Sequence, residues 1–189
     1  MSITRQFLRR PLMTGAVAAS SPQLARAMTH RIGLEDARLV VELGPGTGAF
    51  TAEILRLIPP RARLVAVELN PRLAARLAAA HGDDRLTVVH GAAADLASVA
   101  EGPVDAVVSG LPWTVMPARQ RHRTLDAVTQ VLAPGGRFTT FAYLHAAWTP
   151  PARRVNDELR DRFSELQRGQ VVWHNLPPAF VYRAGHACS

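Results

Sequence analysis

The sequence has few of the residues that carry redox, metal or Schiff-base chemistry. Cysteine occurs once, as Cys188 near the C-terminus, which excludes an intramolecular disulfide and a cysteine-rich metal site. All 22 basic residues are arginine, and without lysine the chain cannot form a lysine Schiff base. The 7 histidines lack the spacing of metal ligands. We therefore expect no metal centre and no redox chemistry.

Long apolar runs are also missing. No stretch reaches the roughly 20 apolar residues of a membrane-spanning helix. The N-terminus mixes arginine with apolar residues, unlike a secretory signal. We expect a cytoplasmic protein, and its 189 residues suffice for one domain. The formal net charge of +7 favours an anionic partner, for which nucleic acid and an anionic membrane surface fit equally well.

From residue 38 onward, apolar runs of strand length alternate with helical patterns. This alternation is typical of a parallel sheet with helices on both faces, so the predicted fold class is α/β. A tight turn at Pro134-Gly135-Gly136 leads into the fifth strand. The expected strands span residues 38–43, 63–68, 85–90, 104–109, 136–143, 169–174 and 179–184. The expected helices span residues 48–58, 71–81, 117–132 and 152–166.

Residues 1–35 are expected to be helical or irregular. An amphipathic segment over residues 3–10 combines apolar residues with three arginines and can lie on a membrane. A second helix is expected to begin at Ser20 or Ser21, with a proline in its first turn.

A glycine-rich turn joins the first expected strand to the helix that follows. The strand RLVVEL contains Glu42, and Gly44, Gly46 and Gly48 follow in a G-x-G-x-G pattern. Glycine lets the backbone approach a ligand, and open α/β sheets bind ligands at this carboxyl edge. Glu68 ends the next strand, where its carboxylate can accept both hydrogen bonds of a ribose diol. A dinucleotide fingerprint would read G-x-G-x-x-G, and Glu42 suits a cationic cofactor better than a pyrophosphate.

These residues resemble the first two motifs of the seven-stranded class I methyltransferases. The resemblance implies a Rossmann-like sheet that binds S-adenosylmethionine and releases S-adenosylhomocysteine. Gly44, Gly46 and Gly48 would then pack under the cofactor, with Glu42 nearby and Glu68 on the ribose. The same resemblance adds cofactor contacts from neighbouring segments, at Thr14, Leu69, Ser109 and Leu111.

The loop after the third strand is where similar enzymes read adenine. They often have an acid directly after the loop glycine, but Ala92 follows Gly91 here. Recognition then falls to Asp95, as acceptor for the adenine amino group, or to the backbone at Ala92 and Ala93. Alternatively, Asp95 is the N-cap of the next helix.

The segment after the fourth strand reads Ser109-Gly110-Leu111-Pro112-Trp113. Adenine-N6 methyltransferases have an Asn/Asp-Pro-Pro-aromatic or Asn-Leu-Pro-Tyr motif here, whose polar side chain holds the amine while the ring stacks on the base. Gly110 cannot hold an amine, whereas Trp113 can still face a base or an alkylammonium group. This pattern favours the alkylammonium acceptor.

Residues 7–28 and 173–183 are similar to the bacterial phospholipid N-methyltransferases, which convert phosphatidylethanolamine to its methylated forms and phosphatidylcholine. The more specific marks are Thr14-Gly15, Ser20-Ser21 and Asn175-x-Pro177-Pro178.

This second resemblance implies that residues 1–35 cover the cofactor and dock on anionic lipid at the inner face of the cytoplasmic membrane. The methyltransferase domain would then span residues 36–189. Arg5, Arg9 and Arg10 suit such a surface, because each basic residue near it contributes about 1 kcal/mol. Alternatively, the apolar residues of this segment pack on the domain.

Methyl transfer requires a neutral amine, but an ethanolamine headgroup is mostly ammonium at neutral pH. Tyr143 and His145 follow the fifth strand at the ligand edge and are the candidate proton acceptors. We favour Tyr143, because a lone histidine is more often a surface residue than a base. Trp113 and Trp148 are candidate walls around the methylated ammonium group.

Two other functions stay open. An RNA adenine dimethylase agrees with the basic charge and the cofactor loop, but Gly110, Ala92 and the absence of an added RNA-binding domain beyond residue 189 oppose it. A peripheral membrane protein that binds the cofactor without activity also fits. We expect the lipid enzyme, acting as a monomer without a stable nucleic-acid partner.

Overall fold

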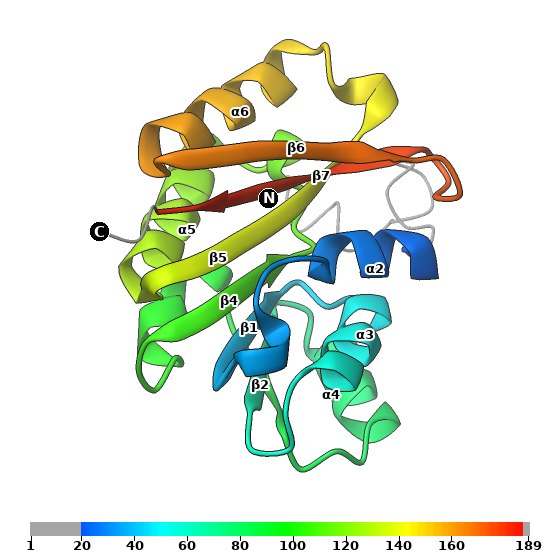
Figure 1. Ribbon diagram of the computed structural model, residues 1–189, viewed down its shortest axis with the longest axis vertical. Coiled ribbons are helices and arrows are strands. Elements are labelled where there is room, and N and C mark those ends of the chain that lie inside the picture. Colours follow the sequence, from blue (N-terminus) through cyan, green and yellow to red (C-terminus); the bar gives the residue numbers. More distant parts are fainter. Residues whose placement is uncertain (1–19, 187–189) are drawn as a thin grey trace.

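The computed structural model describes residues 20–186, and a seven-stranded sheet forms its centre (Figure 1). The strand order is β3-β2-β1-β4-β5-β7-β6. The first five strands in this order are parallel, and β7 runs antiparallel between β5 and β6. This arrangement confirms the predicted α/β class. The strands are β1 (Leu39–Leu43), β2 (Arg63–Glu68), β3 (Leu86–His90), β4 (Val104–Ser109), β5 (Leu132–Tyr143), β6 (Glu165–Val172) and β7 (Ala179–Gly185).

Helices connect the strands, and three of them begin with the same local signal. Ser21, Asn70 and Thr149 each accept a hydrogen bond from the first helical turn, and a proline follows each of them. Such a cap satisfies a free N–H group, and proline tolerates the first helical position. The α-helices are α2 (Pro22–Thr29), α3 (Ala49–Leu57), α4 (Pro71–Ala80), α5 (Ala118–Val131) and α6 (Pro150–Arg162). The 3-10 helices are η2 (Leu34–Asp36), η3 (Ala93–Ser98), η4 (Trp113–Val115) and η5 (Leu144–Ala146).

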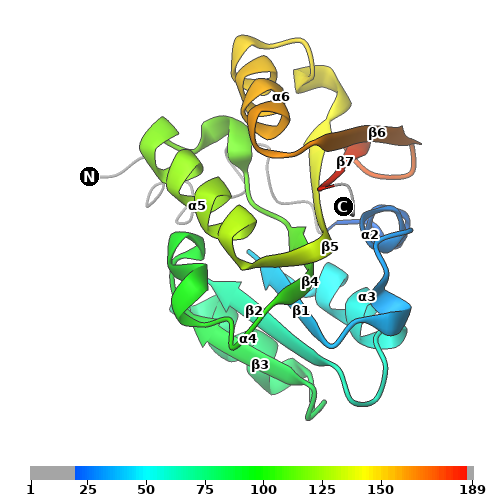
Figure 2. The same cartoon turned by 60° about the vertical axis from the view of Figure 1, so that its left-hand side comes forward.

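The sheet separates two apolar cores. On one face, α2 and α3 bury Leu24 and Ile54 against the sheet, and α4 lies beside α3 in Figure 1. On the other face, Leu125 of α5 and Leu159 of α6 are buried in the second core. Figure 2 shows these two helices on that side of the sheet. Helices on both faces explain why β1 is buried along its whole length.

The turn predicted at Pro134–Gly136 lies inside β5 rather than before it. Leu132 already pairs with Val104, and the pairing shifts before Arg137 meets Ala106. The extra residues form a bulge, in which the φ of 75° at Gly135 requires glycine.

Helix α2 is held against the sheet at both of its ends. At its start, the Ser21 N–H donates to Asn175 Oδ1 over 3.0 Å. At its end, Arg183 donates to the carbonyl oxygens of Ala27 and His30 over 2.7 and 2.9 Å. Residues 20–35 therefore share their core with the rest of the described chain.

The predicted membrane-docking segment at residues 3–10 and the predicted cofactor residue Thr14 lie outside the described residues. None of the helices within residues 20–186 is both long and apolar enough to cross a bilayer.

Candidate cofactor and acceptor site

The predicted site residues within residues 20–186 lie at or after the carboxyl ends of the parallel strands, and the glycine loop between β1 and α3 lies at the centre of this edge. Gly44, Gly46 and Gly48 have φ angles of 68°, 56° and 85°, which L side chains rarely adopt. A Cβ atom added to Gly46 would meet nothing within 4 Å. The loop thus presents bare backbone to open space, as a ligand lying against it would need.

Glu68 lies beside this loop at the end of β2. Its side chain is buried, and Oε2 accepts a hydrogen bond from the Gly46 N–H over 3.2 Å. Oε1 accepts one from the Asn70 N–H over 2.9 Å. A carboxylate oxygen can accept more than one hydrogen bond, so both oxygens can still receive ribose hydroxyls. Leu69, the next residue, exposes 41% of its surface at the same edge.

Glu42 is the most deeply buried acid of the site. It is 0% exposed, and Oε2 accepts a 2.6 Å hydrogen bond from the Thr51 hydroxyl. Burial raises its pKa to about 8. Among the described residues, Oε1 has no hydrogen-bond partner. The unpartnered carboxyl oxygen of Glu42 can accept a hydrogen bond, and a nearby cofactor with an ammonium and a sulfonium group would favour its ionised form.

The segment after β4 packs directly on the glycine loop. A Cβ atom on Gly110 would lie 2.7 Å from the Gly44 carbonyl oxygen, so only glycine fits this backbone. A Cβ atom on Gly44 would lie 2.9 Å from Leu111, which brings Leu111 next to the predicted cofactor contacts. Close packing therefore requires glycine at position 110, in addition to the effect on acceptor chemistry inferred from the motif.

Trp113 does not line the acceptor side as expected. It is 3% exposed and packs edge-on against Phe138, with ring centroids 6.0 Å apart. Its Nε1–H donates to Ser109 Oγ over 3.2 Å, and that oxygen also accepts the Leu111 N–H over 3.4 Å. The ring is therefore a core residue that fixes the segment after β4, and Ser109 is its buried partner.

In the loop after β3, the prediction that Asp95 is the N-cap of the next helix is wrong. The N-cap position of η3 is Ala92, and Asp95 lies within the helix. Its exposed carboxylate is 3.7 Å from Arg123 Nη2 on α5. Ala92 and Ala93 are partly exposed at the edge of the sheet. Recognition of adenine by Asp95 or by these two backbone groups stays a prediction.

Tyr143 and His145 lie together at the end of β5. Their rings stack with centroids 5.8 Å apart, and Tyr143 also packs edge-on against Phe141 at 5.4 Å. Partial burial raises the pKa of the Tyr143 phenol. Trp148, two residues after the end of η5, is 70% exposed. The structure thus places Tyr143 against His145, whereas Trp148 is exposed to solvent.

Two residues of this edge had no role assigned from the sequence. Thr51 is the buried partner of Glu42. Asn175 is 4% exposed, and it connects the turn between β6 and β7 to the start of α2. The Ser20-Ser21 and Asn175-x-Pro177-Pro178 stretches, 154 residues apart, therefore meet in space. No local sequence pattern gives such a long-range contact.

Comparison with known proteins agrees with this geometry. A methyltransferase domain family matches residues 40–136. An ornithine lipid N-methyltransferase of Singulisphaera acidiphila is 32% identical over 182 residues, which cover 94% of this chain and 91% of that protein. The ribosomal RNA small subunit methyltransferase A of Leifsonia xyli is 40% identical over 96 residues, but these cover 48% of this chain and 33% of that protein.

A comparison with solved structures shows the same fold. The O-methyltransferase TomG of Streptomyces achromogenes, solved in complex with SAM, superposes with a TM-score of 0.69 at 20% identity, covering 97% of this chain and 87% of TomG. The chain therefore belongs to the class I S-adenosylmethionine-dependent methyltransferases. Its cofactor is S-adenosylmethionine, and the residues around the glycine loop fit that molecule.

Proposed function

We propose that this methyltransferase N-methylates the amine headgroup of a membrane lipid, with phosphatidylethanolamine as the acceptor and phosphatidylcholine as the final product. The observation that carries the proposal is Gly110, whose packing on Gly44 leaves no room for the amide or acid that would hold a nucleobase amine. The nearly full-length relative that methylates a lipid amine supports the same choice. We further propose that the enzyme acts as a monomer at the inner face of the cytoplasmic membrane.

When bound, S-adenosylmethionine supplies an activated methyl group. Its methyl carbon would pass from the sulfur to the neutral lipid nitrogen, and S-adenosylhomocysteine would be the leaving product. The lipid ammonium must lose a proton before each transfer. The chain's own task is to position the amine and to take up that proton.

The burial of Tyr143 changes the order of the two proton-acceptor candidates. Because its pKa is raised, the phenol is neutral at physiological pH and cannot act as an anionic base. Its oxygen can still accept a hydrogen bond from the ammonium group and orient it. His145, stacked on the Tyr143 ring and exposed, is then the better candidate to accept the proton.

Lipid analysis of a phosphatidylcholine-free bacterium that expresses the chain tests the proposal. We expect mono-, di- and trimethylated ethanolamine lipids by mass spectrometry, and their loss in a strain that expresses Glu68→Ala. With purified protein and labelled cofactor, ethanolamine lipid, ornithine lipid and small-subunit ribosomal RNA are offered in parallel. Transfer to ornithine lipid alone would correct the headgroup, and transfer to RNA alone would overturn lipid methylation.

A further inference from the structure

Within residues 20–186, exposed large apolar side chains occur at only one edge of the sheet. Within residues 20–186, all five of them follow the carboxyl ends of strands, including the turn between β6 and β7, because β6 runs in the same direction as β5. Leu69 belongs to the cofactor half of this edge, next to Glu68. The other four lie on the half formed by β4, β5, β7 and β6, and we call them the acceptor rim. The acceptor rim consists of Val115, Trp148, Trp173 and Leu176.

The turn between β6 and β7 fixes two residues of the acceptor rim in exposed positions. Trp173 and Leu176 are 68% and 80% exposed, whereas Asn175 between them is 4% exposed. Asn175 accepts the Ser21 N–H and donates to the Pro177 carbonyl oxygen over 2.7 Å. The turn therefore buries its polar residue and holds two large apolar residues outward, the reverse of the usual arrangement.

The charge around the acceptor rim has one sign. The segments that carry it, residues 110–122, 144–154 and 173–178, contain no aspartate or glutamate. Three arginines in these segments are exposed, namely Arg119, Arg153 and Arg154. Each is in the first turns of α5 or α6, which begin at the same edge of the sheet.

We propose that the acceptor rim docks on the interface of an anionic bilayer. Tryptophan prefers the headgroup level of a membrane, where its ring is apolar and its N–H stays hydrated. Arginines beside it are attracted to anionic lipid headgroups. Docking would bring the bilayer surface to the half of the edge that carries Tyr143 and His145. The proposal deepens the proposed lipid methylation but does not depend on which headgroup is methylated.

Tryptophan fluorescence with brominated lipids tests the docking. The vesicles contain phosphatidylglycerol with brominated acyl chains and neither ethanolamine nor choline lipid, so the proposed substrate and its product play no part. We expect emission from Trp148 and Trp173 to be quenched. Trp113, which is 3% exposed, is an internal reference that should not be quenched. In Trp148→Phe/Trp173→Phe, quenching should disappear.

Binding variants separate apolar insertion from net charge. Trp148→Ser/Trp173→Ser/Leu176→Ser should bind the vesicles at least about tenfold more weakly. Arg153→Glu/Arg154→Glu should also lose about tenfold or more. The matched control, Arg38→Glu/Arg61→Glu, makes the same charge change on exposed residues that precede β1 and β2 at the opposite edge. An equal loss in both charge variants would overturn the proposal, because net charge alone would then explain the binding.

Other occupants of the acceptor rim give different results. If residues 1–19 or a second copy of the chain covered it, acrylamide would fail to quench Trp148 and Trp173 before vesicles are added, and the proposal would be wrong. Absence of bromine quenching together with methylation of lipid in detergent micelles would also overturn the docking, while leaving the proposed function intact. Quenching without methylation of any lipid amine would support the docking and overturn the proposed function.

Discussion

Both oxygens of the Glu68 carboxylate accept backbone N–H groups, which holds the side chain at the end of β2 and next to the glycine loop. We expect Glu68→Ala to weaken S-adenosylmethionine binding by about 10- to 100-fold, because hydrogen bonds to a charged acceptor contribute about 1.5–3 kcal/mol. Isothermal titration calorimetry measures this change.

A ligand variant makes the Glu68 test specific for ribose. An S-adenosylhomocysteine analogue with 2′-deoxyribose should bind the wild type more weakly than the parent ligand does. In Glu68→Ala the two ligands should bind almost equally, since the partner of the hydroxyl is gone. If both proteins discriminated the ligands to the same extent, the ribose assignment would be wrong.

Glu42 makes stability depend on pH. Its pKa is raised from 4.5 to about 8 in the folded protein. Between these values the folded state holds a proton that the unfolded state has lost, so the free energy of unfolding falls as pH rises. The contribution is complete below about pH 4.5 and is lost as pH rises through about 8, with a slope of up to about 1.4 kcal/mol per pH unit.

The Glu42→Gln variant isolates this effect, because glutamine has the same shape and does not titrate. Urea denaturation of both proteins, at several pH values across this window, gives the difference in unfolding free energy. We expect the wild type to lose stability relative to Glu42→Gln as pH rises. Parallel pH profiles would show that Glu42 does not hold its proton in the fold.

Gly110→Asn restores the polar residue of the adenine motif but conflicts with the backbone of the glycine loop. The new Cβ atom would lie 2.7 Å from the Gly44 carbonyl oxygen. We expect a loss of about 1–3 kcal/mol in unfolding free energy and weaker cofactor binding, without RNA methylation. The control is Gly82→Asn, because Gly82 is exposed with nothing within 4 Å of its Cβ position. Unchanged stability in Gly110→Asn would contradict the packing argument.

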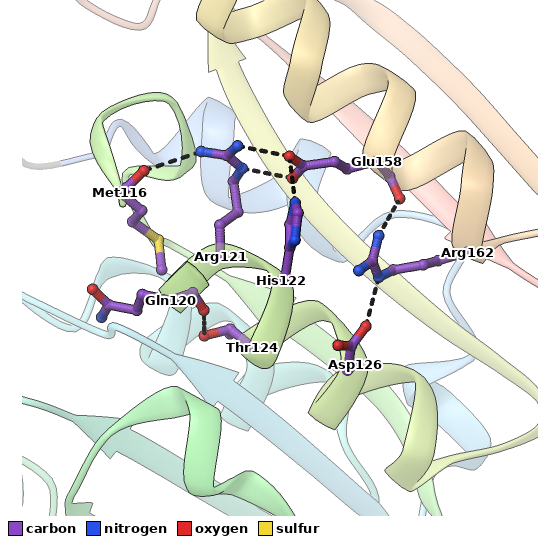
Figure 3. Close-up of polar contacts among 8 residues, drawn as sticks. All are labelled: Met116, Gln120, Arg121, His122, Thr124, Asp126, Glu158 and Arg162. Atoms are coloured by element: carbon purple, nitrogen blue, oxygen red, sulfur yellow. Dashed lines mark hydrogen bonds and ion pairs between the residues drawn. The ribbon is translucent and has the colours of Figure 1, made fainter. Parts of the chain in front are cut away.

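At the scale of elements, an ion-pair network joins α5 to α6 (Figure 3). Arg121 donates two hydrogen bonds of 2.6 Å to the Glu158 carboxylate and a third to the Met116 carbonyl oxygen over 3.0 Å. Burial raises the pKa of Glu158, but hydrogen bonds from Arg121 and His122 outweigh it and lower the pKa overall. Because Met116 directly follows η4, the network also fixes the segment that carries Trp113.

Removing one partner of this network should be costly. Glu158→Ala leaves the Arg121 guanidinium without its carboxylate in a site where its side chain is 7% exposed. We expect a loss of about 3 kcal/mol in chemical denaturation. The matched control is Asp126→Ala, which breaks the pair with Arg162 where the aspartate is 65% exposed, and it should lose less than about 1 kcal/mol. Equal losses would mean that burial does not strengthen the network.

Burial decides which elements the sequence predicts well. The expected ranges of β1 to β4 agree with the structure within one residue. The apolar runs of β1, β2 and β4 are buried on both faces. β3 lies at an edge of the sheet and is only partly buried, but it still contains Leu86, Val88 and Val89. The range expected for β6 was four residues late at its start. Gln167, Arg168 and Gln170 make this strand polar, and it lies at the end of the sheet with β7 as its one partner. β6 therefore lacks the apolar run that marks a buried strand.

Some features of the site could likewise be predicted from the sequence and others could not. The conformation of the glycine loop depends on residues next to one another in the chain, so its sequence predicts it. The burial of Trp113 depends on Phe138 and Ser109, which belong to two different strands. Likewise, the contact between Ser21 and Asn175 joins the two ends of the described chain. Long-range packing of this kind leaves no periodic signal in the sequence.

At the scale of the whole molecule, the carboxyl edge has two halves with different chemistry. The half after β1, β2 and β3 contains Glu42, Glu68 and Asp95, and it suits a cationic cofactor. In the half after β4, β5 and β6, residues 110–122, 144–154 and 173–178 contain no aspartate or glutamate and include three exposed arginines. The net charge of +7 is therefore unevenly distributed over this edge, and we expect the acceptor half to contact the anionic surface.

Ionic strength distinguishes this electrostatic attraction from chemistry at the site. Raising salt from about 0.1 M to about 1 M shortens the Debye length from about 10 Å to about 3 Å. If lipid methylation is the function, its rate on vesicles that contain phosphatidylglycerol should fall by about tenfold or more. Its rate on the same lipid in neutral detergent micelles should change little, because the cofactor-site carboxyl groups of Glu42 and Glu68 are buried and salt screens them weakly. Equal inhibition of both reactions would place the salt effect in the cofactor site and would contradict a charged acceptor half.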